Sequence, residues 1–516
     1  MFNVERAERE REEREREERE RLEREQAERE RAEKERREQE RVKRKRVEQE
    51  LLLRHLKPVE TGYQREFRCM DGTRQSLLNR TVDWVANKSG QESAQRSNTT
   101  WFYGPPGIGK TTLAHSICAS LHERSHLAGA FFCQRDHPNL SKPLKILPTF
   151  IHKLARLFPP FRSIVAKHLC DDPGLTQQSM QGALFLDLIR SLPHHPQHAL
   201  VFVIDALDEC GDARSRPDLL RVLTSAAAQA PWFKIIITSR AEVDIQHFFD
   251  TLTQTSHLYD LATDQDASAD LQTFARTQLD LVASIRHLDT PWPKESDFNR
   301  IISRANGLFL FIKTLVLALE HCEDPEEFLK AALQDSTGTG LESLYELYSS
   351  ILKTQIVHQN AEFRRMIGVL TTSPYRALCD DTIAELAEVK PNLVKKWVDA
   401  LSSLLYRDEA ANRGIRVRHL SVYDFFVSDQ STSVRHSSHL TTPIQGSMSM
   451  SANVHPRVCV SFKCALLVEI FANLRLARES LVLLKSTHHY ITTLSPLRAT
   501  LPSRRAPLSR CPPTPF

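Results

Sequence analysis

The amino-acid sequence predicts an α/β fold in which a doubly wound parallel sheet is followed by a helical domain and a winged helix, and is preceded by a charged single helix. Three observations predict this organisation. Short apolar runs alternate with helical patterns from residue 62 onward, strand-like runs stop after about Asp264, and residues 5–50 are almost all glutamate and arginine. Alternating strands and helices are typical of parallel sheets with helices on both faces.

Length and composition exclude several classes of protein. The 516 residues allow several domains, since one domain per roughly 100 to 200 residues is usual. The net charge of +4 is too small a surplus to indicate a nucleic-acid partner. The 10 cysteines form no CxxC pair and indicate reduced thiols rather than a zinc site. The sequence has neither an apolar signal segment nor an apolar run of the ~18 residues of a membrane span, so we expect a cytoplasmic protein.

Residues 1–55 predict one long charged helix. Glutamate is followed repeatedly, four residues later, by arginine or lysine, and such pairs stabilise a helix by roughly 0.2 to 0.5 kcal/mol each. The few apolar residues are spaced by fives and tens and therefore cannot form the seam of a coiled coil. We expect a solvated single helix, with partial disorder as the alternative. The basic segment 41–46 is interpreted as the end of this helix, with a nuclear import signal as the alternative.

Residues 62–265 predict the parallel sheet. The strand candidates are Trp101–Tyr103, Ala128–Cys133, Leu200–Ile204, Phe233–Ile237 and, more weakly, His257–Leu261. The run from Leu200 to Ile204 is apolar on both faces, as expected of a central strand covered by helices on each side.

The remainder of the chain predicts helices, a winged helix and a tail. Residues 266–340 form the predicted helical domain, in which Asp324 caps a helix that begins at Pro325 and runs through Leu333. Residues 341–430 form the predicted winged helix. Its parts are a helix around Leu344–Leu352, the helices Thr382–Val389 and Asn392–Leu405, a polar turn Arg407–Gly414 and a strand Ile415–His419. Residues 431–516 are expected to be a partly disordered tail.

The segment from Gly104 to Thr111 carries the strongest chemical signal. It matches G-x-x-x-x-G-K-[ST] and lies between an apolar strand and a helical pattern, which is the context of a phosphate-binding loop. Its glycines let backbone N–H groups surround phosphate oxygens, Lys110 faces the β and γ phosphates, and the hydroxyl of Thr111 is offered to Mg²⁺. The chain is therefore predicted to be a P-loop NTPase. The predicted nucleotide-binding residues are Gly104, Pro105, Pro106, Gly107, Ile108, Gly109, Lys110, Thr111 and Thr112.

Two further strands end in polar residues at the same predicted sheet edge. Asp205, Asp208 and Glu209 follow the strand Leu200–Ile204, and a cluster of carboxylates there indicates a cation. Asp205 is the expected Mg²⁺ ligand together with Thr111, and either Asp208 or Glu209 would orient or activate the attacking water. Arg240 follows Phe233–Ile237 and is expected to contact the γ phosphate.

His419 is a candidate of a different kind. If residues 415–421 form a strand, Ile415, Val417 and His419 point to one apolar face, and the histidine needs a buried partner. A satisfied core histidine is the simplest interpretation of this fragment. The segment from Ser421 to Asp424 is expected to cap a following helix.

Several ordered motifs resemble the NACHT-type signalling NTPases of the STAND class, most of all the NOD-like receptor proteins of fungi. They cover about 70% of the chain, from Cys69 to Val427. The motifs are Cys69–Arg74 with Trp84, Gly129–Cys133 with Arg135 and Asp136, Asp205–Glu209 as an extended Walker B motif, Thr238–Arg240 as sensor 1, Ala305–Phe309 as a helical-domain signature, and Arg418–Phe425 as the winged-helix histidine motif.

This resemblance implies a function. In that family the three domains close over ADP, and the winged-helix histidine, here His419, touches the β phosphate. Exchange for ATP opens the module and drives homo-oligomerisation, with slow hydrolysis and an effector that the resemblance leaves unknown. GTP is not excluded. Family members usually carry ankyrin or WD40 repeats after the winged helix, whereas residues 431–516 have no such repeat, and the N-terminal charged helix differs from the usual effector domains.

Three alternatives stay open at this point. The first is a conventional P-loop enzyme such as a kinase or motor ATPase, and the second is a scaffold with a structural nucleotide. The third is a DNA-binding winged helix that uses Lys390, Lys395, Lys396 and Trp397. Acidic residues between Asp380 and Glu388 offset this basic group, so we expect no nucleic-acid partner.

Overall fold

The computed structural model describes residues 2–86, 97–135, 137–171, 181–191, 198–252, 256–289, 291–334, 338–356, 361–372, 377–408 and 413–428. The predicted tail 431–516 lies outside the described residues, and so does Asp136 of the motif Gly129–Cys133 with Arg135 and Asp136. The predicted domain boundaries at residues 55, 62, 265, 340 and 430 stay predictions.

A five-stranded parallel sheet forms the centre of the N-terminal half, as predicted. Its strands are β1 (Thr99–Tyr103), β2 (Leu127–Phe132), β3 (Leu200–Asp205), β4 (Phe233–Ser239) and β5 (His257–Asp260). They lie in the order β2-β3-β4-β1-β5, and every neighbouring pair is parallel. Strand β4 therefore lies between β1, which precedes the P-loop, and β3. The carboxyl ends of these three parallel strands are adjacent at one edge of the sheet.

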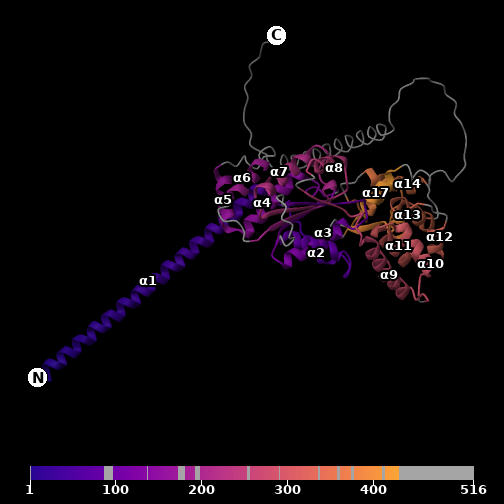
Figure 1. Cartoon of the computed structure of the whole chain (residues 1–516). Coiled ribbons are helices and arrows are strands. Elements are labelled where there is room, and N and C mark those ends of the chain that lie inside the picture. The colour runs from indigo at the N-terminus through magenta and orange to yellow at the C-terminus, as the bar shows by residue number, and fades with distance from the viewer. Residues whose placement is uncertain are drawn as a thin grey trace, which may run out of the picture. The chain divides into compact units, whose positions relative to one another are not determined.

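Helices cover both faces of this sheet, which confirms the doubly wound arrangement (Figure 1). Val201 and Val203 of β3 belong to one hydrophobic cluster, and Phe202 and Ile204 belong to the other. The helices of this region are α2 (Gln75–Val85), α3 (Lys110–Glu123), α4 (Ile146–Leu157), α5 (Pro159–Asp171), α6 (Gln181–Arg190), α7 (Ser215–Gln229) and α8 (Val243–Asp250). Helices α2 and α3 share the cluster of Val201, whereas α4 to α8 share the cluster of Phe202.

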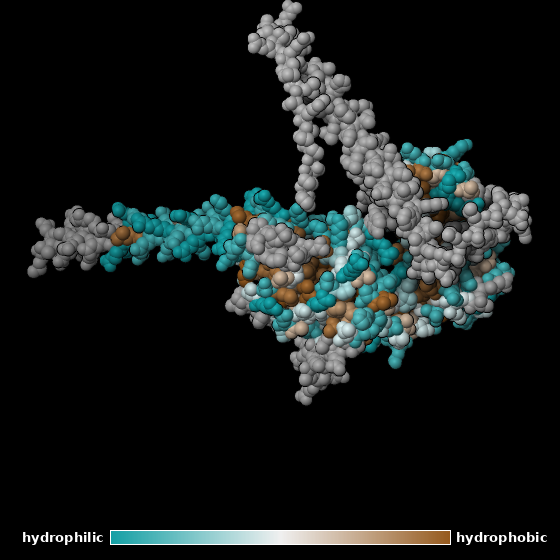
Figure 2. All heavy atoms as spheres, turned by 90° about the horizontal axis from the view of Figure 1, so that it is seen from above, coloured by the Kyte–Doolittle hydropathy of each residue, from teal (hydrophilic) through white to brown (hydrophobic). Residues whose placement is uncertain are grey.

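The N-terminal charged segment is one helix, α1 (Phe2–Leu56), of 55 residues. The side chains from 21 to 46 are exposed, and Figure 2 shows a mostly hydrophilic surface along this part of the helix. Full solvation is nevertheless wrong for the last turns. Leu52 and Leu56 are 2% and 3% exposed and join the core of the sheet domain, where α1 contacts α4 and α5.

The helical region contains α9 (Ala267–Ile285), α10 (Glu295–Ala305), α11 (Phe309–His321), α12 (Pro325–Leu333) and α13 (Leu341–Gln355). The predicted cap of α12 is present. Asp324 Oδ1 accepts hydrogen bonds from the backbone N of Glu326 and Glu327, at 2.9 and 3.0 Å.

The last described region contains the two predicted short helices and, after them, an antiparallel hairpin of which only the second strand was predicted. Its elements are α14 (Ala361–Thr372), α15 (Asp380–Ala387), α16 (Pro391–Ala400), β6 (Leu405–Asp408), β7 (Gly414–Val417) and α17 (Leu420–Val427). The predicted extension of α16 to Leu405 is wrong, because Leu405 pairs with Val417 in the hairpin. The predicted polar turn also begins too early, since Arg407 lies in β6.

The structure also bears on the nucleic-acid and membrane partners that the sequence argues against. Trp397 is 7% exposed and packs against the ring of Phe363, so it belongs to the core and not to a DNA-facing surface. Within the described ranges, no helix combines the length and the apolar character needed to span a membrane.

Candidate functional site

A cavity of about 420 Å³ lies where the strand ends, the helical region and the N-terminus of α17 meet. Most of the predicted site residues line it: the P-loop from Pro106 to Thr112, Asp208, Glu209, Arg240 and His419. Gly104, Pro105 and Asp205 lie directly behind this lining and contact residues that form it. The structure thus brings together candidates that are up to about 300 residues apart in the sequence.

The P-loop is docked on helix α11. Gly107 and Gly109 have φ values of +83° and +96°, a left-handed conformation that only glycine adopts without strain. A Cβ on Gly107 would lie 2.6 Å from Leu310 Cβ, and Leu310 N donates a hydrogen bond to Gly107 O at 3.0 Å. The loop that would hold phosphates is therefore in direct contact with the helical region.

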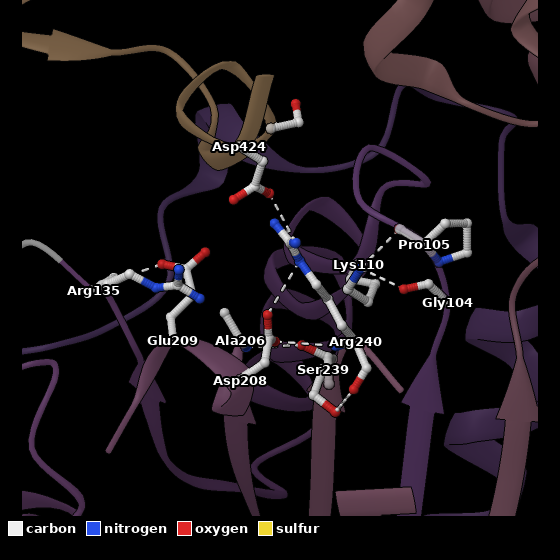
Figure 3. A network of polar contacts seen from close by, with 12 residues as sticks. Gly104, Pro105, Lys110, Arg135, Ala206, Asp208, Glu209, Ser239, Arg240 and Asp424 are labelled. Atoms are coloured by element: carbon white, nitrogen blue, oxygen red, sulfur yellow. Dashed lines mark hydrogen bonds and ion pairs between the residues drawn. The ribbon is translucent and has the colours of Figure 1, made fainter. Parts of the chain in front are cut away.

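Lys110 is held by the loop itself. Its Nζ donates hydrogen bonds to the carbonyl oxygens of Gly104 and Pro105, both at 2.9 Å (Figure 3). Burial lowers its pKa to about 8, partly offset by the nearby carboxylate of Asp208. The lysine is still mainly protonated at neutral pH and faces a cavity in which an anion would stabilise its charge.

Asp205 is buried at the end of β3 and is surrounded by hydroxyl groups. Its Oδ1 accepts a hydrogen bond from Thr238 Oγ1 at 2.5 Å, and the nearby side chain of Thr111 also favours the ionised carboxylate by lowering its pKa. Burial raises its pKa to about 6. A carboxylate and a hydroxyl oxygen are donors that Mg²⁺ prefers, so Thr111 and Asp205 fit this ion. Among the described residues, no group of three or more His, Cys, Asp or Glu side chains could hold a metal by itself.

The two remaining acids have different surroundings. Asp208 accepts a hydrogen bond from Arg240 N at 3.0 Å and forms an ion pair with Arg240 Nε at 3.4 Å. Glu209 Oε2 accepts a hydrogen bond from Arg135 N at 3.2 Å. Burial, reinforced by the charge of Asp208, raises the pKa of Glu209 to about 7. Asp208 is thus engaged in a hydrogen bond and an ion pair with Arg240. Glu209, in contrast, has a pKa suited to proton transfer near neutral pH.

Arg240 connects two parts of the molecule. Besides its contacts with Asp208, its Nη1 donates a hydrogen bond to Asp424 Oδ2 of α17 at 3.0 Å (Figure 3). The guanidinium lines the cavity. It occupies the predicted sheet edge, but two carboxylates already hold it.

His419 lies at the cavity in a role that the strand prediction missed. Strand β7 ends at Val417, and His419 is the N-cap of α17. Its Nδ1 accepts a hydrogen bond from Ser421 N at 3.1 Å, so the neutral ring carries its proton on Nε2. Burial and the charges of Arg240, Lys110 and Lys313 lower its pKa to about 3. The expectation that Ser421 opens the cap is wrong, because the imidazole supplies the acceptor.

Further residues line the cavity that sequence reasoning did not single out as site residues. They are Glu66–Met70, Thr73 and Arg74 before α2, Phe274 and Gln278 on α9, and Phe309, Leu310 and Lys313 on α11. The rings of Phe274 and Phe309 lie 5.5 Å apart. Some of these residues belong to the motifs Cys69–Arg74 and Ala305–Phe309, which the sequence does indicate. The motifs alone do not predict that these residues lie beside the P-loop.

Arg74, one of these further lining residues, holds three segments of the chain together. Its Nη1 forms an ion pair with Asp264 Oδ2 at 2.7 Å, its Nη2 donates to Ile108 O at 3.2 Å, and both groups of the pair are buried. A single side chain therefore joins the segment before α2, the P-loop and the segment between β5 and α9.

Comparison with known proteins agrees with the motifs. The family described as "Nephrocystin 3, N-terminal" matches residues 72–240. The vegetative incompatibility protein HET-E-1 of Podospora anserina is 27% identical over 346 residues, which are 64% of this chain and 24% of that protein. The chain thus spans about a quarter of the length of this relative.

Solved structures with partial likeness include the Walker-type ATPase PABY2304 of Pyrococcus abyssi and the ORC2 protein of Aeropyrum pernix. Both are 14% identical and cover 72% of this chain and 99% of their own, with TM-scores of 0.33 and 0.30. The fold class rests on the strand order and on the P-loop between β1 and α3. The predicted resemblance to the NACHT-type NTPases of fungi is confirmed by the sequence matches.

Proposed function

We propose that this NACHT-type P-loop NTPase is a signalling switch that binds ATP or ADP with Mg²⁺, hydrolyses the triphosphate slowly and thereby controls its own oligomerisation. One observation carries the proposal. A single cavity is lined by the P-loop, by the Walker B acids Asp208 and Glu209, and by His419 from the far end of the described chain. An enzyme that only hydrolyses nucleotide does not need a histidine from a distant helical module in its phosphate site.

The phosphate groups would be held by charge and by directed N–H groups. The left-handed backbone of Gly107 and Gly109 would let N–H groups of the loop face phosphate oxygens, and Lys110 would exchange its two carbonyl partners for such oxygens. His419 would donate its Nε2–H to the β phosphate, because its Nδ1 is occupied by Ser421 N. A neutral histidine can make this contact with a diphosphate without a change of protonation.

Glu209 is the residue that we propose as the general base. Its pKa of about 7 allows it to accept a proton from water at neutral pH, whereas Asp208 is engaged by Arg240. Mg²⁺, held by Thr111 and Asp205, would neutralise phosphate charge. The carboxylate of Asp205 would then be ionised, since a cation opposes the effect of burial.

The signalling output is proposed from the relative. HET-E-1 is named for vegetative incompatibility, so we propose that this chain acts in self-recognition, innate immunity or programmed cell death in the cytoplasm of a fungus. Its activated form would be a homo-oligomer that engages an effector protein. GTP is retained as an alternative to ATP.

The test measures assembly and turnover of the full chain. With Mg²⁺ and ADP, light scattering should report a monomer, and a non-hydrolysable triphosphate should give a larger mass. Lys110→Ala should keep the monomer mass with both nucleotides, whereas Lys330→Ala, on the exposed side of α12, should behave as the wild type. Turnover should stay below about 1 s⁻¹.

Two results would redirect the assignment. Rapid turnover at constant mass would favour a conventional P-loop ATPase. Assembly of Lys110→Ala that equals assembly of the wild type would favour a scaffold in which the nucleotide is structural.

A further inference from the structure

The guanidinium of Arg240 is shared between the nucleotide site and helix α17. Its Nε lies 3.4 Å from Asp208 Oδ2, and its Nη1 lies 3.0 Å from Asp424 Oδ2 (Figure 3). The side chains of Arg240 and Asp424 are 21% and 28% exposed, so solvent screens this pair only in part. Arg240 also lines the cavity, which puts one cation within reach of two competing kinds of anion.

Helix α17 is joined to its own module and to the sheet domain by neighbouring residues. Phe425 is fully buried against the rings of Tyr345 and Tyr348, and His419 caps the helix at the cavity. Asp424, next to Phe425, forms the ion pair with Arg240 of the sheet domain. The helix has eight residues, so a contact at Asp424 bears on its whole length.

A terminal phosphate would compete with Asp424 for Arg240. A third phosphate brings additional negative charge to the sheet edge, which attracts the guanidinium and repels the Asp424 carboxylate. A diphosphate is shorter by that group and leaves the ion pair intact. The number of phosphates would thus decide whether Arg240 stays bound to α17.

We propose that Asp424 is a positioning residue that holds Arg240 on α17 while a diphosphate is bound, and that it makes the site discriminate between a nucleoside triphosphate and a nucleoside diphosphate. The inference rests on the proposed function of the cavity as a nucleotide site. Release of this pair by the third phosphate frees α17 from the sheet domain.

The test compares two nucleotides on the full chain in the presence of Mg²⁺. Dissociation constants of ADP and a non-hydrolysable ATP analogue are measured by competition against a fluorescent diphosphate. Asp424→Asn keeps the side-chain size but removes the competing charge, so the ratio of triphosphate to diphosphate affinity should rise by about tenfold. Asp424→Glu keeps the charge and should restore a ratio near that of the wild type.

A matched control is available in the hairpin region. Asp399 also forms an ion pair, with Arg407 at 2.5 Å, and neither residue lines the cavity. Asp399→Asn should therefore leave the affinity ratio unchanged. A double variant, Arg240→Gln with Asp424→Asn, should give the same ratio as Arg240→Gln alone, because Asp424 acts through Arg240.

An unchanged ratio in folded Asp424→Asn would overturn the inference. If this variant does not fold, hydrogen–deuterium exchange of the wild type decides: amides of α17 should exchange faster with the triphosphate, and equal exchange overturns the inference. A wild type that binds neither nucleotide overturns the proposed function itself. Binding of both with an unchanged ratio overturns only the role of Asp424.

Discussion

At the scale of single residues, two neighbouring acids have different chemistry because their surroundings differ. Asp208 forms an ion pair with Arg240, whereas Glu209 is buried beside the charge of Asp208, which the backbone N–H and the charge of Arg135 offset only in part. Burial without a compensating cation favours the protonated form of a carboxyl group. The sequence left both residues open as the water-orienting acid, and only their partners separate them.

The raised pKa of Glu209 predicts that the free energy of unfolding depends on pH in the absence of nucleotide and Mg²⁺. Its folded-state pKa of about 7 exceeds the ordinary value of 4.5, so the folded state binds the proton more tightly. The associated stability is present below pH 4.5 and is lost as the pH rises through 7, on the order of 3 kcal/mol in total. Urea unfolding at several pH values should show this loss in the wild type and not in Glu209→Gln.

The matched control for this titration is Glu123→Gln, at an exposed position of α3. It should follow the pH profile of the wild type. Parallel profiles for Glu209→Gln and the wild type between pH 4.5 and 7 would contradict the assignment of a raised pKa to Glu209.

The site residues differ in how far the sequence could predict them. The P-loop and Asp205–Glu209 are contiguous motifs whose chemistry follows from local order, and the structure brings both to the cavity. Asp424 lies in the histidine motif, but nothing in the motif indicates that its partner is Arg240, which is 184 residues away. His419 was assigned to a strand, since sequence periodicity cannot show that β7 stops at Val417.

At the scale of elements, α1 is a solvated helix that ends inside the sheet domain. Leu52 and Leu56 are buried, while Leu53 is 52% exposed on the other side of the same turns. The segment after the helix is fixed as well: Val59 N donates to Thr149 Oγ1 at 3.1 Å, and Phe132 N donates to Thr61 Oγ1 at 3.1 Å. The last turns of α1 are therefore a structural part of the sheet domain.

Leu56→Ala should destabilise the sheet domain. It removes a 3% exposed side chain from the core, which costs about 2 to 5 kcal/mol. The midpoint of chemical unfolding, followed by tryptophan fluorescence, should fall accordingly. Leu53→Ala removes the same atoms from an exposed position and should change the midpoint little, and equal effects of the two variants would contradict the packing of α1.

Most helices and strands could be predicted from the sequence, and the elements that were predicted wrongly have a physical explanation. All five strands of the sheet lie at the predicted runs. Strands β1 to β4 are largely buried and therefore apolar on both faces, whereas the edge strand β5 is only partly buried and had the weaker signal. Helix α16 ends before its apolar pattern does, since Leu405 is used by hairpin pairing with Val417. A run of leucines satisfies helix and strand equally, and tertiary pairing decides between them.

At the scale of the whole described chain, the site exists only because separate regions close on one another. Leu310 N of α11 donates a hydrogen bond to Gly107 O of the P-loop, and Asp424 of α17 forms an ion pair with Arg240 of the sheet domain. The sequence could predict the order of these regions through the family resemblance. The resemblance also implied that these regions close over a nucleotide, but the sequence could not predict the contacts that make the closure, because they join residues far apart in the chain.

The nucleotide carried by the purified protein shows whether the cavity holds a diphosphate in a closed switch. The full chain is purified without added nucleotide and denatured, and the released nucleotide is identified and quantified by chromatography. We predict close to one ADP per chain for the wild type, and strong depletion in Lys110→Ala and His419→Ala, since both side chains face the cavity. An empty wild-type site that hydrolyses added triphosphate rapidly would contradict the account of a closed nucleotide switch.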